Sequence, residues 1–160
     1  MNPSFREILE LLNKHQVEYI VVGGVAAVIQ GAPVTTFDID TLVRISEENT
    51  TRLLRVLEEL DARFREHQST MRPTREDIMA GGHLLLMTRA GPMDVLGFIG
   101  DNERYEDLIH ASSDVSMTVG SFRVLNLEEL VRQKKAANRP KDQAVLTLLE
   151  ELLRRRPNDN

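Results

Sequence analysis

A glycine pair followed by two aspartates constrains this chain more than any other feature. The run 19–22 (YIVV) is short, fully apolar and rich in β-branched residues, and it ends at Gly23-Gly24. Such a run predicts a buried strand that stops at a tight turn. Asp38-Ile39-Asp40 follows after residues 25–37. Because glycines between a strand and a helix let peptide N–H groups approach a phosphate, this order of motifs indicates a site for a phosphorylated ligand.

The two aspartates belong to a segment in which polar and apolar residues alternate, which predicts a second strand over residues 37–45. The apolar face of this strand would carry Phe37, Ile39 and Leu42. Side chains at i and i+2 of a strand share a face, with Cα atoms roughly 6.5–7 Å apart, so Asp38 and Asp40 can reach one cation. Magnesium takes a few carboxylate oxygens and fills its other positions with water and substrate phosphate. The alternative is an exposed strand face that carries two acids without a ligand.

The rest of the pattern predicts an α+β domain with a mixed β-sheet flanked by helices. The expected helices cover residues 3–12, 25–30, 46–60, 103–110, 126–137 and 145–156, and the expected hairpins pair 83–89 with 93–98 and 115–119 with 122–125. Ser46 is expected to cap its helix, and Asn126 with Glu129 to form a capping box. The last helix would bury Val145, Leu148, Leu149 and Leu152. Between residues 61 and 82 the pattern is weak and predicts no element.

Composition excludes several classes of protein. The 160 residues, 41% of them apolar, suffice for one domain with a core of its own. The chain has no cysteine, which excludes disulfides and thiolate chemistry, and its net charge of −5 gives no overall footprint for nucleic acid. No apolar run approaches the roughly 20 residues of a membrane span, and no signal peptide opens the chain. We therefore expect a cytoplasmic protein that does not enter a membrane.

Together, the motifs resemble the signature of the DNA polymerase-β-like nucleotidyltransferase superfamily. Gly23-Gly24 and Asp38-Ile39-Asp40 match its first part, and Asp94, within the apolar Met93-Asp94-Val95, matches its third carboxylate on a later strand. The resemblance implies the nucleotidyltransferase fold. It also implies that Asp38 and Asp40 hold one or two magnesium ions that bridge a nucleoside triphosphate such as ATP. Asp94 would complete the metal site and help to activate an incoming hydroxyl.

Two positions near these motifs bear on phosphate binding. Thr36 also matches the family, and the resemblance implies that it binds nucleotide together with Gly23 and Gly24; its alternative role is that of a β-branched strand residue. Val34 stands where related sequences often carry an arginine.

The C-terminal segment carries a second resemblance. Lys134, Ala136-Ala137 and residues 139–142 (RPKD) are similar to the helical ending of small bacterial nucleotidyltransferases related to the AbiEii-type toxins, which implies triphosphate contacts from Lys134, Arg139 and Lys141. Independently of that resemblance, Lys134 continues the buried helical register of this segment, so it must extend to solvent or meet an anion. The alternatives are a structural pair with Asp142 for Lys134, and solvated loop charges for Arg139 and Lys141.

The predicted organisation is a nucleotidyltransferase core over residues 1–125 and a C-terminal helical hairpin over 126–160 that packs on it, within one domain. The implied function is metal-dependent transfer of a nucleoside monophosphate from a nucleoside triphosphate to a hydroxyl of a small molecule, an RNA or a protein. A second copy or a partner subunit could complete the pocket of so short a chain. Two alternatives stand beside it: a non-catalytic nucleotide-binding or antitoxin module of a toxin–antitoxin-like pair, and a structural interaction domain.

Overall fold

The computed structural model describes residues 3–66 and 70–157, with side chains from Phe5 onward. Residues 67–69, which belong to the weakly patterned segment 61–82, lie outside the described residues. The strands are β1 (Tyr19–Val22), β2 (Ile39–Val43), β3 (Arg63–Phe64), β4 (His83–Thr88), β5 (Gly91–Leu96), β6 (Ser112–Met117) and β7 (Gly120–Leu125). The helices are α1 (Pro3–Lys14), α2 (Gly23–Ile29), α3 (Glu47–Glu59), α4 (Arg75–Met79), α5 (Tyr105–Leu108), α6 (Leu127–Ala137) and α7 (Gln143–Arg155), with short 3-10 turns η2 (Ile109–Ala111) and η3 (Pro140–Asp142).

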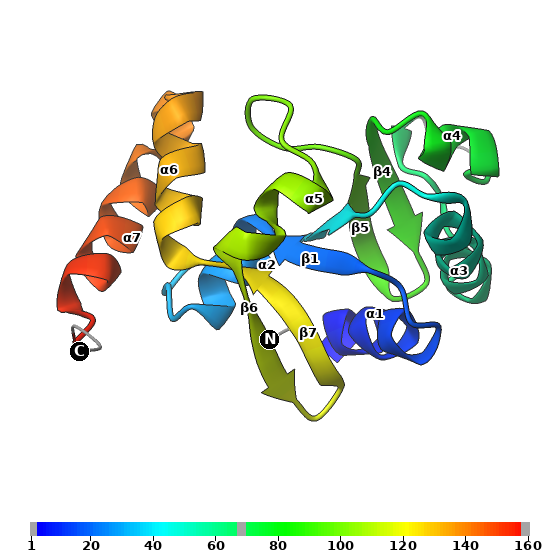
Figure 1. The fold of residues 1–160 in the computed structure, drawn as a ribbon, viewed down its shortest axis with the longest axis horizontal. Coiled ribbons are helices and arrows are strands. Elements are labelled where there is room, and N and C mark those ends of the chain that lie inside the picture. The colour runs from blue at the N-terminus through cyan, green and yellow to red at the C-terminus, as the bar shows by residue number, and fades with distance from the viewer. Residues whose placement is uncertain (1–2, 67–69, 158–160) are drawn as a thin grey trace.

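The described strands form one mixed sheet of seven strands in the order β3-β4-β5-β2-β1-β7-β6 (Figure 1). The central strand β2 runs antiparallel to β1 and parallel to β5. The hairpins β4–β5 and β6–β7 extend the sheet on either side. The α+β class and the mixed sheet predicted from the sequence are confirmed.

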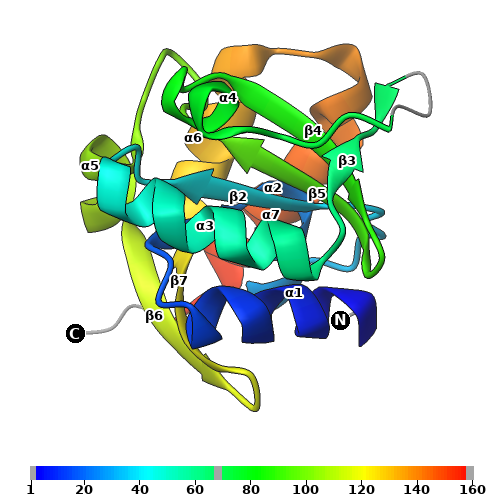
Figure 2. The ribbon, with the colours of Figure 1, turned by 90° about the vertical axis from the view of Figure 1, so that its right-hand side faces the viewer.

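Helices cover the sheet on both sides. Helices α1 and α3 pack against each other and lie on the side of the sheet that faces the viewer in Figure 2, whereas α6 and α7 lie behind it. The side chains that α1 buries, Phe5, Ile8, Leu9 and Leu12, are those expected from the helical spacing. No helix in the described part of the chain has both the length and the apolar character needed to cross a membrane.

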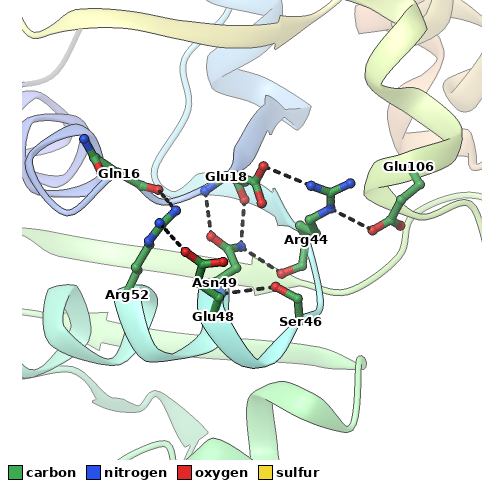
Figure 3. Close-up of polar contacts among 8 residues, drawn as sticks. All are labelled: Gln16, Glu18, Arg44, Ser46, Glu48, Asn49, Arg52 and Glu106. Atoms are coloured by element: carbon green, nitrogen blue, oxygen red, sulfur yellow. Dashed lines mark hydrogen bonds and ion pairs between the residues drawn. The ribbon is translucent and has the colours of Figure 1, made fainter.

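The buried side chain of Asn49 joins α3 to the ends of β1 and β2 that lie away from the aspartates (Figure 3). Its amide nitrogen donates to the carbonyl oxygens of Glu18 (3.0 Å) and Arg44 (2.8 Å), and its oxygen accepts from the Glu18 N–H (2.7 Å). Ser46 accepts the Asn49 N–H (3.1 Å) and is the N-cap that the sequence predicted. This contact ties the two central strands to one helix and thereby fixes their relative position.

The strand that carries the aspartates is shorter than predicted. It begins at Ile39, so Asp38 precedes it, and Phe37 is 81% exposed instead of lying on the apolar face. The Thr36 hydroxyl donates to the carbonyl oxygen of Asp38 (3.0 Å), which replaces sheet pairing with a local bond at this position. The helix after β1 begins at Gly23, earlier than the expected Val25.

Two details of the C-terminal helices were also predicted wrongly. Asn126 stands at the N-cap of α6 without a side-chain cap hydrogen bond, because its side-chain oxygen instead accepts the hydroxyl of Ser113. In α7 the buried residues are Leu146 and Leu149, whereas Leu148 is 37% exposed. Of the four expected residues, Leu149 is buried and Val145 and Leu152 pack against the core, so only Leu148 was placed wrongly. The break after Ala137 lies where predicted, with Asn138 in the left-handed conformation at φ 47°.

Candidate active site

Three aspartates from two neighbouring strands meet at one edge of the central sheet. Asp40 in β2 lies opposite Asp94 in the parallel strand β5, and Asp38 precedes β2 by one residue. One carboxylate oxygen of each of the three lies within 4.8 Å of the other two. The parallel register explains this convergence, because it places the two strand residues side by side on one face.

Glycine is required beside this cluster. Gly23 has φ +64°, and a Cβ atom built there would lie 2.2 Å from Oδ2 of Asp40. A Cβ at Gly24 would lie 2.7 Å from Oγ1 of Thr36, whose hydroxyl also bonds the Asp38 carbonyl. The glycine pair therefore lets the start of α2 pack directly against the aspartate segment.

Crowding of the carboxylates changes their acidity. Burial, together with the neighbouring charges of Asp38 and Asp94, raises the pKa of Asp40 to about 8. Burial and the charge of Asp94 also raise the pKa of Asp38. In addition, Oδ1 of Asp40 is buried without a hydrogen-bond partner. A buried acceptor without a partner, in a set of three oxygen donors, suits a hard divalent cation such as magnesium.

A fourth residue, which the sequence did not single out, contacts the aspartates. Arg65 follows β3 directly, and its Nη2 donates to Oδ1 of Asp94 (2.6 Å). Its Nη1 lies 3.8 Å from Oδ2 of Asp38. The guanidinium lowers the pKa of Asp38 and Asp40 against the upward effect of burial. Arg65 lies in the segment 61–82, where no periodic pattern marks it.

A pocket of about 650 Å³ opens beside Asp40, between the sheet and α6. Its wall includes Gly23, Asp40, Leu130, Gln133, Lys134 and Arg139. Lys134 and Arg139 both pair with Asp142, at 3.5 and 2.6 Å. The structure thus brings two of the three predicted cations to the pocket, together with the alternative pairing of Lys134. Lys141 is exposed and does not line it.

The arrangement of sheet, helices and carboxylates defines the nucleotidyltransferase fold, and solved structures agree with it. The chain is similar to TM1012 of Thermotoga maritima, a candidate nucleotidyltransferase, with TM-score 0.53 and 21% identity over 95% of this chain and 91% of that one. It is similar to the lincosamide antibiotic adenylyltransferase LnuA, solved with lincomycin bound, with TM-score 0.66 and 14% identity over 95% and 98% of the two chains. It is also similar to the antibiotic-resistance factor ANT(2'')-Ia, with TM-score 0.60 and 15% identity over 96% and 86%. No protein-family model matches the sequence, and no curated protein matches it significantly.

Proposed function

We propose that this protein is a metal-dependent nucleotidyltransferase, which moves a nucleoside monophosphate from a nucleoside triphosphate to an acceptor hydroxyl. The observation that carries the proposal is the convergence of Asp38, Asp40 and Asp94 within 4.8 Å. These carboxylates stand beside a glycine-bounded helix start and a pocket whose wall includes Lys134. This combination offers a place for a cation, for phosphates and for the rest of a nucleotide.

Each group has a role in this proposal. Asp38 and Asp40 would hold the magnesium ions, and Asp94 would complete their site. A divalent cation held there would supply positive charge to offset the negative charge that develops during an in-line displacement. The peptide N–H groups at Gly23 and Gly24 would bind phosphate, with Thr36 holding the loop against them.

The proposed transfer forms one bond to the α-phosphorus, breaks another and moves one proton. The acceptor oxygen forms a bond to the α-phosphorus, and the bond from that phosphorus to the oxygen bridging to the β-phosphate breaks. Pyrophosphate leaves with the electron pair of the broken bond, and the hydroxyl proton passes to the carboxylate of Asp94. Lys134 and Arg139, at the pocket wall, would offset the charge of the triphosphate. Lys141, which is exposed, would contact phosphate only at the pocket entrance.

The donor proposed is ATP, because LnuA, whose fold is similar, is an adenylyltransferase. The acceptor proposed is a small hydroxyl compound, because LnuA is an adenylyltransferase of lincosamide antibiotics. Each nucleoside triphosphate, labelled at the α-phosphate, would be incubated with the protein, Mg²⁺ and a cell lysate separated into small molecules, RNA and protein. Label should move from ATP to the small-molecule fraction and should be absent with Asp38→Asn.

The experiment also tests the other acceptors. Label on RNA or on protein would correct the acceptor class and keep the transferase. Tight ATP binding without label in any fraction would overturn the transferase and favour a nucleotide-binding module.

A further inference from the structure

Arg65 reaches the carboxylate cluster from the far side of the β4–β5 hairpin. Its backbone N–H donates to the carbonyl oxygen of Leu85 (2.9 Å), which continues the β3–β4 ladder by one residue. Its Nη2 donates to the carbonyl oxygen of Leu86 (3.0 Å) and to Oδ1 of Asp94 (2.6 Å). One nitrogen of the guanidinium is therefore bonded both to the β4 backbone and to the Asp94 carboxylate.

This anchoring is sheltered from solvent. The side chain of Asp94 is 12% exposed and that of Arg65 is 30% exposed. The Nε atom of Arg65 is buried and has no hydrogen-bond partner, so the loss of its hydration is offset mainly by the contacts of the other two nitrogens. A side chain that served only to join β3 to β4 could do so through Leu86 alone and would not need to meet two acids.

The contact also uses only one of the two carboxylate oxygens of Asp94. Arg65 bonds Oδ1, which leaves Oδ2 outside that hydrogen bond. Arg65 does not line the pocket beside Asp40, so it contacts the cluster from outside the proposed nucleotide site.

We propose that Arg65 is the positioning residue of this site: it fixes Asp94 by one oxygen, and its charge permits Asp38, Asp40 and Asp94 to stand together before a cation binds. The first part of this inference rests on the described contacts alone. Its catalytic consequence rests on the function proposed above.

A charge that offsets carboxylate repulsion should matter most when no divalent cation does so. Arg65→Met is therefore expected to lower the melting temperature in EDTA by about 3–10 °C, a range that follows from a charge-assisted hydrogen bond in a chain of this size. Saturating Mg²⁺ should recover most of this loss. Arg63→Met is the matched control, because Arg63 lies in β3 two residues before Arg65 and pairs with Asp61 at 3.5 Å, away from the cluster. Its effect should be small and independent of Mg²⁺.

Lysine separates charge from geometry. Arg65→Lys keeps the charge but lacks the planar guanidinium, whose Nη2 bonds Leu86 and Asp94 while its Nη1 lies near Asp38. We expect it to recover most of the stability in EDTA, while the kcat for nucleotidyl transfer stays about 10-fold or more below that of the wild type and the KM for the triphosphate changes less than twofold. Should Arg65→Met fail to fold, the lysine variant with and without Mg²⁺ carries the same comparison.

A loss of stability in Arg65→Met that is equal in EDTA and in Mg²⁺ would overturn the proposal and leave Arg65 a link between β3 and β4. A lysine variant no more stable in EDTA than the methionine variant would overturn the part that concerns charge. Failure of the transferase itself would appear differently, as absent transfer in the wild type with the Mg²⁺-dependent difference in stability intact.

Discussion

Asp40 and Asp94 lie opposite each other on the parallel strands β2 and β5. Next to Asp40, the hydroxyl of Thr41 donates a hydrogen bond of 2.9 Å to the carbonyl oxygen of Asp94, which lies 53 residues later in the chain. This bond from the buried Thr41 fixes the register of the two strands from the side of the sheet opposite the carboxylates. The relative position of Asp40 and Asp94 is thus determined by the pairing of β2 and β5. Changes at the site should therefore alter metal binding and local charge while the fold persists.

The first prediction concerns the charge of Asp40. Its pKa is raised to about 8 in the folded protein, above the roughly 3.9 of an unfolded aspartate. The folded state then binds more protons than the unfolded state between these values, so the contribution of Asp40 to stability is complete below pH 4 and is lost as the pH rises through 8. In EDTA, Asp40→Asn should remove this loss and stabilise the protein at pH 8 by about 1–3 kcal/mol.

Urea unfolding of both proteins from pH 4 to pH 9 measures this effect. The wild type should gain stability on addition of Mg²⁺ at pH 8, and Asp40→Asn should gain much less. A wild type whose stability rises over this range relative to the asparagine variant would contradict the assignment of Asp40 as a strained carboxylate.

A second prediction concerns the close approach of Gly23 to the cluster. Gly23→Ala places a methyl group where the carboxylate of Asp40 lies, in a left-handed backbone conformation. We expect a loss of about 1–3 kcal/mol of stability and a loss of Mg²⁺ affinity of 10-fold or more by calorimetry, because Asp40 must move. Gly82→Ala is the control, since no atom lies within 4 Å of a Cβ at Gly82. Equal Mg²⁺ affinity in the two variants would show that Gly23 does not shape the metal site.

The third prediction separates the site from the fold. Asn49 makes three hydrogen bonds to the backbone of Glu18 and Arg44. Asn49→Leu removes all three and leaves the Glu18 carbonyl oxygen only its bond from the Arg44 N–H (3.2 Å). The free energy of unfolding should fall by about 2–4 kcal/mol. At temperatures where the variant remains folded, its Mg²⁺ affinity should equal that of the wild type, because the hydrogen bonds of Asn49 lie at the strand ends away from the aspartates. A parallel drop in Mg²⁺ affinity would mean that the hydrogen bonds of Asn49 also determine the relative position of the three aspartate carboxylates.

The sequence correctly predicted residues in elements with a clear hydrophobic period. It did not predict residues whose position depends on pairing with a strand distant in the sequence. The buried stripe of α1 follows from spacing, and the hairpin of β4 and β5 follows from two apolar runs around Ala90-Gly91-Pro92. Strand β3 has two residues and exists through its pairing with β4, so no local pattern announces it. Arg65 depends on that pairing and was missed for the same reason.

The exposed side chain of Phe37, before β2, shows a second limit of prediction from the sequence. Alternation placed Phe37 on an apolar face, but the strand begins only at Ile39. A period of two does not report where sheet pairing starts when a local hydrogen bond, here between Thr36 and Asp38, competes with it. The relative position of Asp38, Asp40 and Asp94 needed the structure, because the sequence alone does not give the register between β2 and β5.

The last prediction concerns Lys134, for which the sequence left two roles open. Its ammonium lies 3.5 Å from Oδ1 of Asp142, at the long limit of a hydrogen bond, whereas Arg139 holds Oδ2 of the same carboxylate at 2.6 Å. Lys134 also lines the pocket beside Asp40. Because Arg139 alone can satisfy Asp142, Lys134 has a charge to offer to a triphosphate. Lys134→Ala should therefore weaken ATP binding by roughly 10- to 150-fold, as expected for a charge-assisted hydrogen bond of about 1.5–3 kcal/mol, and change the melting temperature by only a few degrees.

Lys135→Ala is the control, since Lys135 carries the same charge on the same helix but pairs with Glu150 at 3.4 Å and does not line the pocket. Calorimetry and thermal unfolding on both variants measure the two quantities. An unchanged affinity with a lowered melting temperature would assign Lys134 to the pair with Asp142 that joins α6 to the turn before α7.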